Sequence, residues 1–269
     1  MLALQCQCLS KTRHAPDGSV WIRTYPVTFL HDVTQRDHDT AWHQLTFATR
    51  GHLEVVTATA RHLVPSDRAV WVPAGTPHTR VMRAPVSMRS LYIAPAAFGT
   101  TPPSTTLRTI AVSPLLRALI LHITRIGALD RKVPAHARLI GVLIDQLAAA
   151  EDVALALPSP RDPRAQRFAE LVTRDPGGDA AIATLARRAG ASMRTLERCF
   201  VAETGLAVGE WRRRVRLFHA LRLLEGGASV TDVALDAGYA TPSAFCQSFK
   251  KMFGTSPRRY RTSDAAMRA

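Results

Sequence analysis

Several features on which particular protein classes depend are scarce in this sequence. Cysteine occurs only four times in 269 residues, and no two cysteines have the C-x-x-C spacing of a zinc site. We therefore expect four reduced thiols and no structural metal. No apolar run approaches the roughly 18 residues of a membrane-spanning helix, and the N-terminal residues lack the pattern of a secretion signal. These absences predict a cytoplasmic protein that does not enter a membrane.

Acidic side chains are also few. The 21 Asp and Glu residues face 35 Lys and Arg residues, which gives a net charge of +14, and all but four of the basic residues are arginines. Residues 1–160 carry +6 of this charge and the last 109 residues carry +8. Arginine favours bidentate contacts to phosphate or carboxylate. The balance favours a polyanionic partner, nucleic acid before an anionic membrane, although an arginine-rich proteome would also produce part of it.

The rest of the composition predicts two folded domains. With 46% hydrophobic residues in 269, the chain can bury two cores of ordinary size. Residues 155–164, LALPSPRDPR, contain three prolines and interrupt all periodicity. We therefore predict a first domain of residues 1–154, a linker of residues 155–164 and a helical domain of residues 165–262.

The first domain is expected to combine β-structure with a pair of helices. Residues 20–95 contain short runs rich in Val, Ile, Thr, Tyr and Trp, and turn residues separate these runs about every 8–12 residues, as in an antiparallel barrel or sandwich. Residues 113–152 change to a helical period, with Ser113 as the expected N-cap and Pro114 at the first helical position. Because this hairpin is strongly apolar, it needs the barrel or a second copy as a partner, and we interpret it as a homodimer interface.

The second domain contains an internal repeat. Six positions recur, separated by 48 residues in the first two pairs and by 49 in the others. The pairs are Ala186 and Ala234, Gly190 and Gly238, Ser192 and Thr241, Leu196 and Phe245, Phe200 and Phe249, and Gly205 and Gly254. One residue is therefore inserted in the turn of the second unit.

Each repeat unit predicts a helix-turn-helix motif. A short helix ends at the first glycine, which adopts the left-handed conformation easily, and Ser192 or Thr241 then caps a second helix. In such a motif the second helix enters the major groove of DNA. A plain helical hairpin repeat would explain the alanines, glycines and aromatic residues equally well, but it would not explain the basic outer faces.

One long helix of about residues 208–225 is expected to join the two motifs. At about 1.5 Å per residue it spans roughly 27 Å, which is less than the roughly 34 Å between successive major-groove faces. Both motifs therefore reach adjacent grooves only if the DNA bends or one motif docks imperfectly. The helix opens with Arg212, Arg213, Arg214 and Arg216. Its buried stripe is expected to be Leu217, Ala220, Leu221 and Leu224. The arginines on the other faces either contact DNA or form a solvated surface.

Residues 167–261 resemble the DNA-binding domain of the AraC/XylS transcription regulators. The run AxxxGYATPSAFCQSFKKMFGTSPRRYR, from Ala234 to Arg261, is close to the C-terminal signature of that family. The resemblance implies that two recognition helices read adjacent major grooves of double-stranded DNA. It assigns the DNA contacts to Arg194, Glu197 and Arg198 in the first motif, Arg213 on the joining helix, and Pro242, Ser243, Gln247, Lys250 and Lys251 in the second motif.

The side-chain chemistry of these positions sharpens the expectation. Arg198 has the geometry to pair with guanine, and Gln247 can pair bidentately with adenine. Glu197 is acidic where many relatives are basic or carry an amide, so it either accepts from cytosine or orients Arg194 and Arg198.

Two motifs in the first domain resemble those of cupins. HDTAWHQLTFATRG, at residues 38–51, places His38, Thr40 and Gln44 at three ligand positions, and VPAGTPH, at residues 72–78, places His78 at the fourth. A metal-dependent cupin needs two or three imidazoles and usually a carboxylate, and only two of the four ligands are kept. We therefore expect no metal and no cofactor, and we interpret His38, Gln44, Trp71 and His78 as contacts to a small-molecule effector.

The chain as a whole resembles AraC-family regulators with a cupin-like sensor domain. WHQLTFATRG, AVWVPAGTPH and MRSLYIAP are similar to a branch that contains regulators of drug-efflux genes responding to nitroaromatic compounds. The resemblance implies a homodimeric, effector-controlled transcription regulator that is not an enzyme and that works with RNA polymerase. The alternatives are a metal-dependent cupin enzyme fused to a DNA-binding domain, and a DNA-binding protein without an effector.

Overall fold

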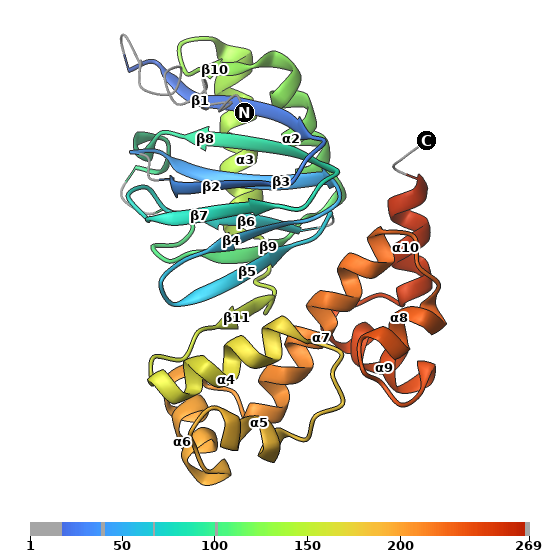
Figure 1. The fold of residues 1–269 in the computed structure, drawn as a ribbon. Coiled ribbons are helices and arrows are strands. Elements are labelled where there is room, and N and C mark those ends of the chain that lie inside the picture. Colours follow the sequence, from blue (N-terminus) through green and yellow to red (C-terminus); the bar gives the residue numbers. More distant parts are fainter. Residues whose placement is uncertain (1–17, 39–40, 67, 100–101, 267–269) are drawn as a thin grey trace. The chain divides into compact units, whose positions relative to one another are not determined.

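The computed structural model describes residues 18–38, 41–66, 68–99 and 102–266. It confirms the predicted α+β architecture, because antiparallel strands with two helices precede a region dominated by helices (Figure 1). By its internal contacts the chain divides into two compact units. The first contains Met1–Val55 and Val64–Ala154, and the second contains Val56–Leu63 and Leu155–Ala269.

The strands form two antiparallel sheets. The six-stranded sheet has the order β10-β1-β8-β3-β6-β9, and its strands are β10 (Ala128–Asp130), β1 (Val20–Phe29), β8 (Val86–Ile93), β3 (His43–Arg50), β6 (Arg68–Val72) and β9 (Arg108–Ala111). The five-stranded sheet has the order β11-β5-β4-β7-β2, and its strands are β11 (Ala156–Pro158), β5 (Ala60–Val64), β4 (Leu53–Val56), β7 (His78–Met82) and β2 (Val33–His38).

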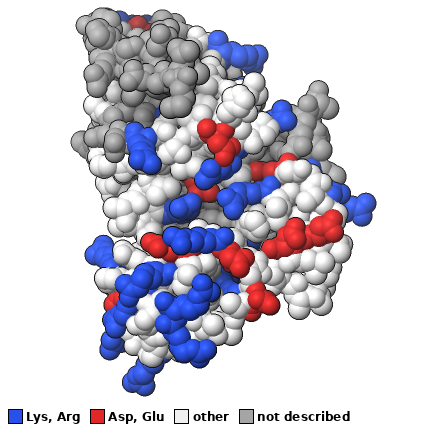
Figure 2. All heavy atoms as spheres, viewed as in Figure 1, with Lys and Arg blue, Asp and Glu red and all other residues white. Residues whose placement is uncertain are grey.

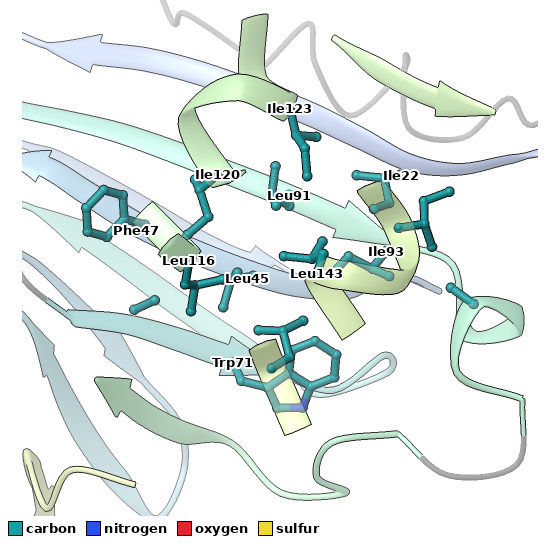
Figure 3. Packing of buried hydrophobic residues seen from close by; sticks show 14 of the residues in the cluster. Ile22, Leu45, Phe47, Trp71, Leu91, Ile93, Leu116, Ile120, Ile123 and Leu143 are labelled. Atoms are coloured by element: carbon teal, nitrogen blue, oxygen red, sulfur yellow. The ribbon is translucent and has the colours of Figure 1, made fainter. Parts of the chain in front are cut away.

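One face of the six-stranded sheet packs against two helices, α2 (Pro114–Ile126) and α3 (Pro134–Ala148). The start of α2 is as predicted, since the Ser113 hydroxyl accepts a hydrogen bond from the Leu116 N–H and Pro114 is the first helical residue. Side chains of β3, β6 and β8 meet those of the helices in a buried apolar cluster that includes Leu45, Trp71 and Leu143 (Figure 3). A short 3₁₀ helix, η1 (Pro95–Phe98), adds Phe98 to this cluster.

The opposite face of this sheet lines a second apolar cluster between the two sheets. Successive residues of a strand point to opposite faces, so Val70 lies in this cluster whereas both of its neighbours lie in the first. Leu53, Val55 and Met82 come from the five-stranded sheet. We call the side of each sheet that faces this cluster the interior face.

The second unit contains seven helices among the described residues. They are α4 (Pro163–Arg174), α5 (Ile182–Arg188), α6 (Met193–Thr204), α7 (Val208–Glu225), α8 (Val230–Asp236), α9 (Pro242–Phe253) and α10 (Pro257–Ala266). The joining helix α7 has the bounds expected from the sequence, and its predicted apolar stripe is buried. No helix in the described part of the chain combines the length and the apolar character needed to cross a membrane.

Two aromatic clusters stabilise the helices of the second unit. Phe200 of α6 contacts Phe168 and Trp211 with T-shaped ring geometry, at centroid distances of 5.6 and 5.4 Å. In the second repeat, Phe249 lies 5.6 Å from Phe245 and 4.4 Å from Phe253. The apolar positions i and i+4 of the repeat therefore face inward, as predicted.

The segment expected as a linker contains the strand β11. It pairs antiparallel with β5, and the residue opposite Ala156 is His62. On the helical side, the Trp211 indole N–H donates to the Pro158 carbonyl at 2.8 Å, and Arg214 Nη1 donates to the Ala156 carbonyl at 2.9 Å. The prolines in the sequence indicate that helical periodicity ends here. They do not indicate that this segment pairs with β5 and accepts hydrogen bonds from α7.

Candidate nucleic-acid interface

The first repeat folds as the predicted helix-turn-helix. The turn after α5 passes through Gly190, whose φ of +78° is in the left-handed region that glycine adopts most readily. The Ala191 N–H donates to the Ala186 carbonyl at 3.0 Å and closes the end of α5. Ser192 then caps α6 by accepting from the Thr195 N–H at 3.1 Å. The sequence pattern thus fixes both ends of the turn.

The second repeat has the same local geometry. Gly238 has a φ of +73°, and the Tyr239 N–H donates to the Ala234 carbonyl at 2.9 Å. Thr241 caps α9 by accepting from the Ala244 N–H at 3.2 Å, and Pro242 occupies the first helical position. Burial raises the pKa of the Tyr239 phenol, whose ring lies 5.4 Å from that of Phe245. The predicted repeat is therefore a structural repeat as well.

The two recognition helices expose the residues that the sequence assigned to DNA. On α6, Arg194 and Arg198 are exposed, while Leu196 and Phe200 are buried on the other face. On α9 the exposed residues include Pro242, Ser243, Gln247, Lys250 and Lys251. Arg194 and Arg198 are four residues apart, as are Ser243 and Gln247, so each pair shares one face of its helix. The first surface is cationic, and the second is polar at its start and cationic at its end.

Glu197 has a structural partner that the sequence did not indicate. One of its carboxylate oxygens accepts from the Val208 N–H, the first residue of α7, at 3.2 Å. Ala207 precedes α7 without a side-chain capping bond of its own. Because the N-terminus of a helix leaves unsatisfied N–H groups and carries partial positive charge, a carboxylate stabilises it. This contact accounts for an acidic residue between two arginines without any contact to DNA.

The four arginines at the start of α7 do not form one surface, which corrects the interpretation of Arg212–Arg216 as a basic cluster directed at DNA. Arg212 is only 9% exposed, and its guanidinium donates to the carbonyls of Ala180 and Gly178 at 2.8 and 2.6 Å. Arg216 donates to the carbonyls of Pro176 and Gly178.

Of the other two arginines, Arg214 bonds to β11 as described above, and Arg213 is exposed. Arg213 forms an ion pair with Glu210 one turn earlier in α7. Burial lowers the pKa of both Arg212 and Arg214. Arg213 is therefore the member of this set that can reach a phosphate.

Further basic side chains surround the recognition helix of the first repeat. In Figure 2, Lys and Arg side chains gather over the part of the surface where Figure 1 labels α4, α5 and α6. Exposed arginines in these helices include Arg187 and Arg188 at the end of α5, besides Arg194 and Arg198. Arg187 and Arg188 are not among the residues predicted from the sequence to contact DNA. Their position at the end of the helix before the turn is the signal that could have found them.

In the first unit, the predicted effector contacts Gln44 and Trp71 lie on opposite faces of the six-stranded sheet. Gln44 is buried on the interior face of β3, and its cross-strand neighbours are Val72 and Tyr92. Trp71 is paired with Leu45, one position away, and therefore points to the opposite face (Figure 3). There it packs against the helices, and its indole N–H donates to the Ser104 carbonyl at 3.0 Å. Strand alternation therefore places Trp71 in the core beside the helices, on the face opposite Gln44.

The two predicted histidines lie opposite each other in the five-stranded sheet. The Cα atoms of His38 on β2 and His78 on β7 are register partners, and the side chain of His38 lies outside the described residues. His78 is buried, and its Nδ1 lies 2.8 Å from the Thr76 carbonyl. Arg80, two residues further on, is only 1% exposed and shares the face of Met82 toward the interior. Arg80 is not among the predicted effector contacts, and the alternation in HTRVM is the sequence signal that places it on the same face as His78.

His43, which lies between the motif positions, has a packing role. Its ring stacks on Trp71 at 4.9 Å, and its Nδ1 accepts from the Ala74 N–H at 3.0 Å. Burial lowers its pKa, which agrees with a neutral ring that accepts at Nδ1. Within the described part of the chain, no three His, Cys, Asp or Glu side chains are grouped closely enough to hold a metal ion.

Both units of the chain are similar to known protein families. Residues 185–263 match the family described as a helix-turn-helix domain, and residues 28–157 match the family described as an AraC-like ligand binding domain. The HTH-type transcriptional regulator NimR of Escherichia coli is 34% identical over 229 residues, which are 85% of this chain and 83% of NimR.

Two solved structures are also similar to this chain. The DNA-binding domain of AdpA, solved in complex with a target DNA, is 35% identical, with 40% of this chain and 97% of that chain covered and a TM-score of 0.38. ToxT from Vibrio cholerae is 11% identical, with 90% of this chain and 98% of ToxT covered and a TM-score of 0.38.

Proposed function

The chain belongs to the AraC family of transcription regulators, and on that premise we propose that it reads two adjacent major-groove segments of one DNA site, one with α6 and one with α9. The observation that carries this proposal is the pair of matched turns. After each turn, one face of the following helix is buried in the motif. The other face is exposed and carries residues suited to contact bases and phosphates. The similarity to transcription regulators favours this function over a metal-dependent cupin enzyme.

The exposed side chains divide into base-reading and backbone-binding groups. Arg198 presents a planar guanidinium that can bond to guanine N7 and O6, and Gln247 presents an amide that can bond to adenine. Lys250, Lys251 and Arg213 supply charge for phosphates, which positions the protein on DNA without specifying its sequence. Glu197 is left out of the contact set because α7 engages its carboxylate.

The proposal is tested by selecting duplexes from a random-sequence DNA pool with the full chain and measuring Kd as a function of salt. We expect one enriched sequence with two conserved segments, and a log Kd that rises steeply with log salt because phosphate neutralisation releases counterions. The double variant Arg194→Ala, Arg198→Ala should lose the selectivity at the first segment. Arg222→Ala removes an exposed arginine at the other end of α7, and serves as the control for charge. The proposal would be contradicted if no DNA sequence were enriched or if Kd did not change with salt concentration.

We further propose that a small-molecule effector binds on the interior faces of the sheets of the first unit. Buried polar groups on these faces include Gln44, Tyr92, His78 and Arg80, and they would fix the orientation of a ligand whose apolar part meets the second cluster. The guanidinium of Arg80 would donate to nitro or carboxylate oxygens. A nitroaromatic compound is the first probe, because of the resemblance of the sequence to regulators of that branch.

Calorimetry with this probe would test the site. Gln44→Leu keeps approximately the volume of the side chain but removes its hydrogen bonds, and we expect it to weaken binding of the probe by about tenfold, the loss from about 1.4 kcal/mol of hydrogen bonding. Exchange of the exposed Leu30 for Ala is the matched control. Equal affinities for Gln44→Leu and the wild-type chain would exclude this face.

The homodimer interface is proposed on α2 and α3. The core-facing side chains of both helices are buried, whereas Leu115 is 52% exposed, Ile126 is 39% exposed and Val142 is 41% exposed. A second copy would cover these residues, and it would place two DNA-binding domains on one DNA. Sedimentation of the Leu115→Glu, Val142→Glu variant is expected to give a monomer where the wild-type chain gives a dimer. We also propose that the regulator acts in the cytoplasm on RNA polymerase, which an in vitro transcription assay would test.

A further inference from the structure

The loop between α4 and α5, residues 175–181, joins three parts of the DNA-binding unit. Its carbonyls accept hydrogen bonds from two arginines of α7. Gly178 O receives both Arg212 Nη2, at 2.6 Å, and Arg216 Nη2, at 2.9 Å. Arg212 Nη1 also donates to Ala180 O, and Arg216 Nε donates to Pro176 O. A guanidinium can do this because its donors lie in one rigid plane and reach two carbonyls at once.

The same loop lies against the turn of the second helix-turn-helix motif. A Cβ on Gly177 would overlap the carbonyl oxygen of Asp236, at the end of α8. A Cβ on Gly238 would overlap the carbonyl oxygen of Gly177, and it would also lie only 2.8 Å from Arg216 Nη2. Close backbone approach therefore requires both glycines, and Gly238 is also required by its left-handed φ of +73°. A segment that leads into the first motif thus contacts the turn of the second.

Neighbouring carboxylates partly compensate the charge on Arg212. Burial and then repulsion by Arg216 lower the pKa of Arg212, while Asp175 and Asp179 act in the opposite direction. A buried guanidinium is tolerated when hydrogen bonds and opposite charges compensate it. Such an arrangement holds its partners in one geometry more strictly than apolar packing does, because each bond has a direction.

We propose that Arg212 and Arg216 are positioning residues that set the distance and angle between the recognition helices α6 and α9. This inference rests on the proposed function for its meaning. Without the junction, only the shared helix α7 and the apolar contacts between neighbouring helices would relate the two motifs. With the junction, the loop that leads into the first motif also contacts the turn of the second motif at Gly238, three residues before the cap of α9.

Operator spacing provides the first test. Duplexes selected by the full chain are compared with derivatives that carry one base pair inserted between the two contacted segments. The insertion turns the second segment by about 35° and shifts it by about 3.4 Å. We expect wild-type protein to bind the inserted duplex roughly 10- to 100-fold more weakly, as expected when one segment is no longer read.

The Arg216→Ala variant should tolerate the insertion, so that its penalty falls below about threefold even though its affinity for the original duplex also falls. Arg216→Lys keeps the charge and one donor group, and it should recover part of the penalty. Arg222→Ala, on the same helix and with the same change of charge, should keep the wild-type penalty. An unchanged spacing penalty in Arg216→Ala would overturn the proposal.

A measurement without DNA separates this proposal from the proposed function. Spin labels are attached to Val201→Cys on α6 and Ala244→Cys on α9, two exposed positions, after the native cysteines have been replaced by serine. We expect a narrow distance distribution for wild type and a broader one for Arg216→Lys and Arg212→Lys, which retain charge and whose folding is checked by circular dichroism. Equal widths would refute the positioning role whether or not the chain binds DNA.

Discussion

The two helix-turn-helix motifs have the same local geometry but different surroundings. Gly190 and Gly238 both take left-handed φ values, and Ser192 and Thr241 make equivalent capping bonds. Around Gly190, the nearest atom to an added Cβ is the end of the Arg167 side chain at 3.4 Å. Around Gly238 it is the backbone of another loop. The comparison shows that a repeated sequence pattern sets the fold of a motif, whereas its packing decides how much else depends on it.

The largest expected effect comes from placing alanine at the two turn glycines. Gly190→Ala should lower the free energy of unfolding by about 1–2 kcal/mol, the cost of the left-handed conformation for a residue with a Cβ. Gly238→Ala should lower it by more than about 3 kcal/mol, because backbone overlap with Gly177 adds to that cost. Hydrogen exchange of amides in α6 and α9 measures both. Equal losses of unfolding free energy in the two variants would show that the loop around Gly177 moves aside at no energetic cost.

The next effect concerns what the two recognition helices read. Arg198→Ala should reduce discrimination at one base of the first segment by about 1–3 kcal/mol, and Gln247→Ala should do the same in the second segment. Affinities for a set of duplexes with single base changes distinguish the two. If either variant weakens all duplexes equally, that residue contacts the phosphate backbone.

A smaller effect is expected from the caps. Ser192→Ala and Thr241→Ala should each cost about 1 kcal/mol of stability, since each removes the acceptor for a helix N–H. Thermal unfolding of the full chain monitored at 222 nm would detect it. Ser243→Ala, at an exposed position of α9 that caps nothing, is the control and should change stability by less than about 0.5 kcal/mol. A cap variant that matches this control would show that its hydrogen bond contributes nothing.

The smallest effect on stability is expected at Arg213, between the motifs. Its ion pair with Glu210 lies at the surface, with the Arg213 side chain 48% exposed, so Arg213→Ala should change the free energy of unfolding by less than about 0.5 kcal/mol. The same variant should reduce the slope of log Kd against log salt by about one, because one phosphate contact is lost. A slope identical to that of wild type would remove Arg213 from the interface.

Sequence reasoning predicted the elements of the fold better than it predicted the functional faces. The bounds of α7, the start of α2 at Pro114 and the two capped turns follow from signals within a few residues of each position. In contrast, the partner of Glu197 is 11 residues away, and the partners of Arg212 are 32 and 34 residues away. Their chemistry allowed DNA contacts, and only folding revealed competing partners.

The sensor domain gives the same result at the level of a single strand. The motif positions Gln44 and Trp71 both suggested an effector site, yet they face opposite sides of one sheet. Alternation along a strand shows which residues share a face, but it does not show which face meets helices and which meets the second sheet. For the same reason, Arg80 was not predicted to lie on the interior face.

The sequence by itself determined the repeat, its turns and the density of positive charge, because these depend on residues close together in the chain. The tertiary structure decided which charges stay at the surface. Arg194 and Arg198 remain exposed, whereas Arg212 and Arg216 bond to backbone carbonyls of a distant loop. A guanidinium can donate to a carbonyl as well as to a phosphate, so its partner depends on which acceptor the fold brings within reach.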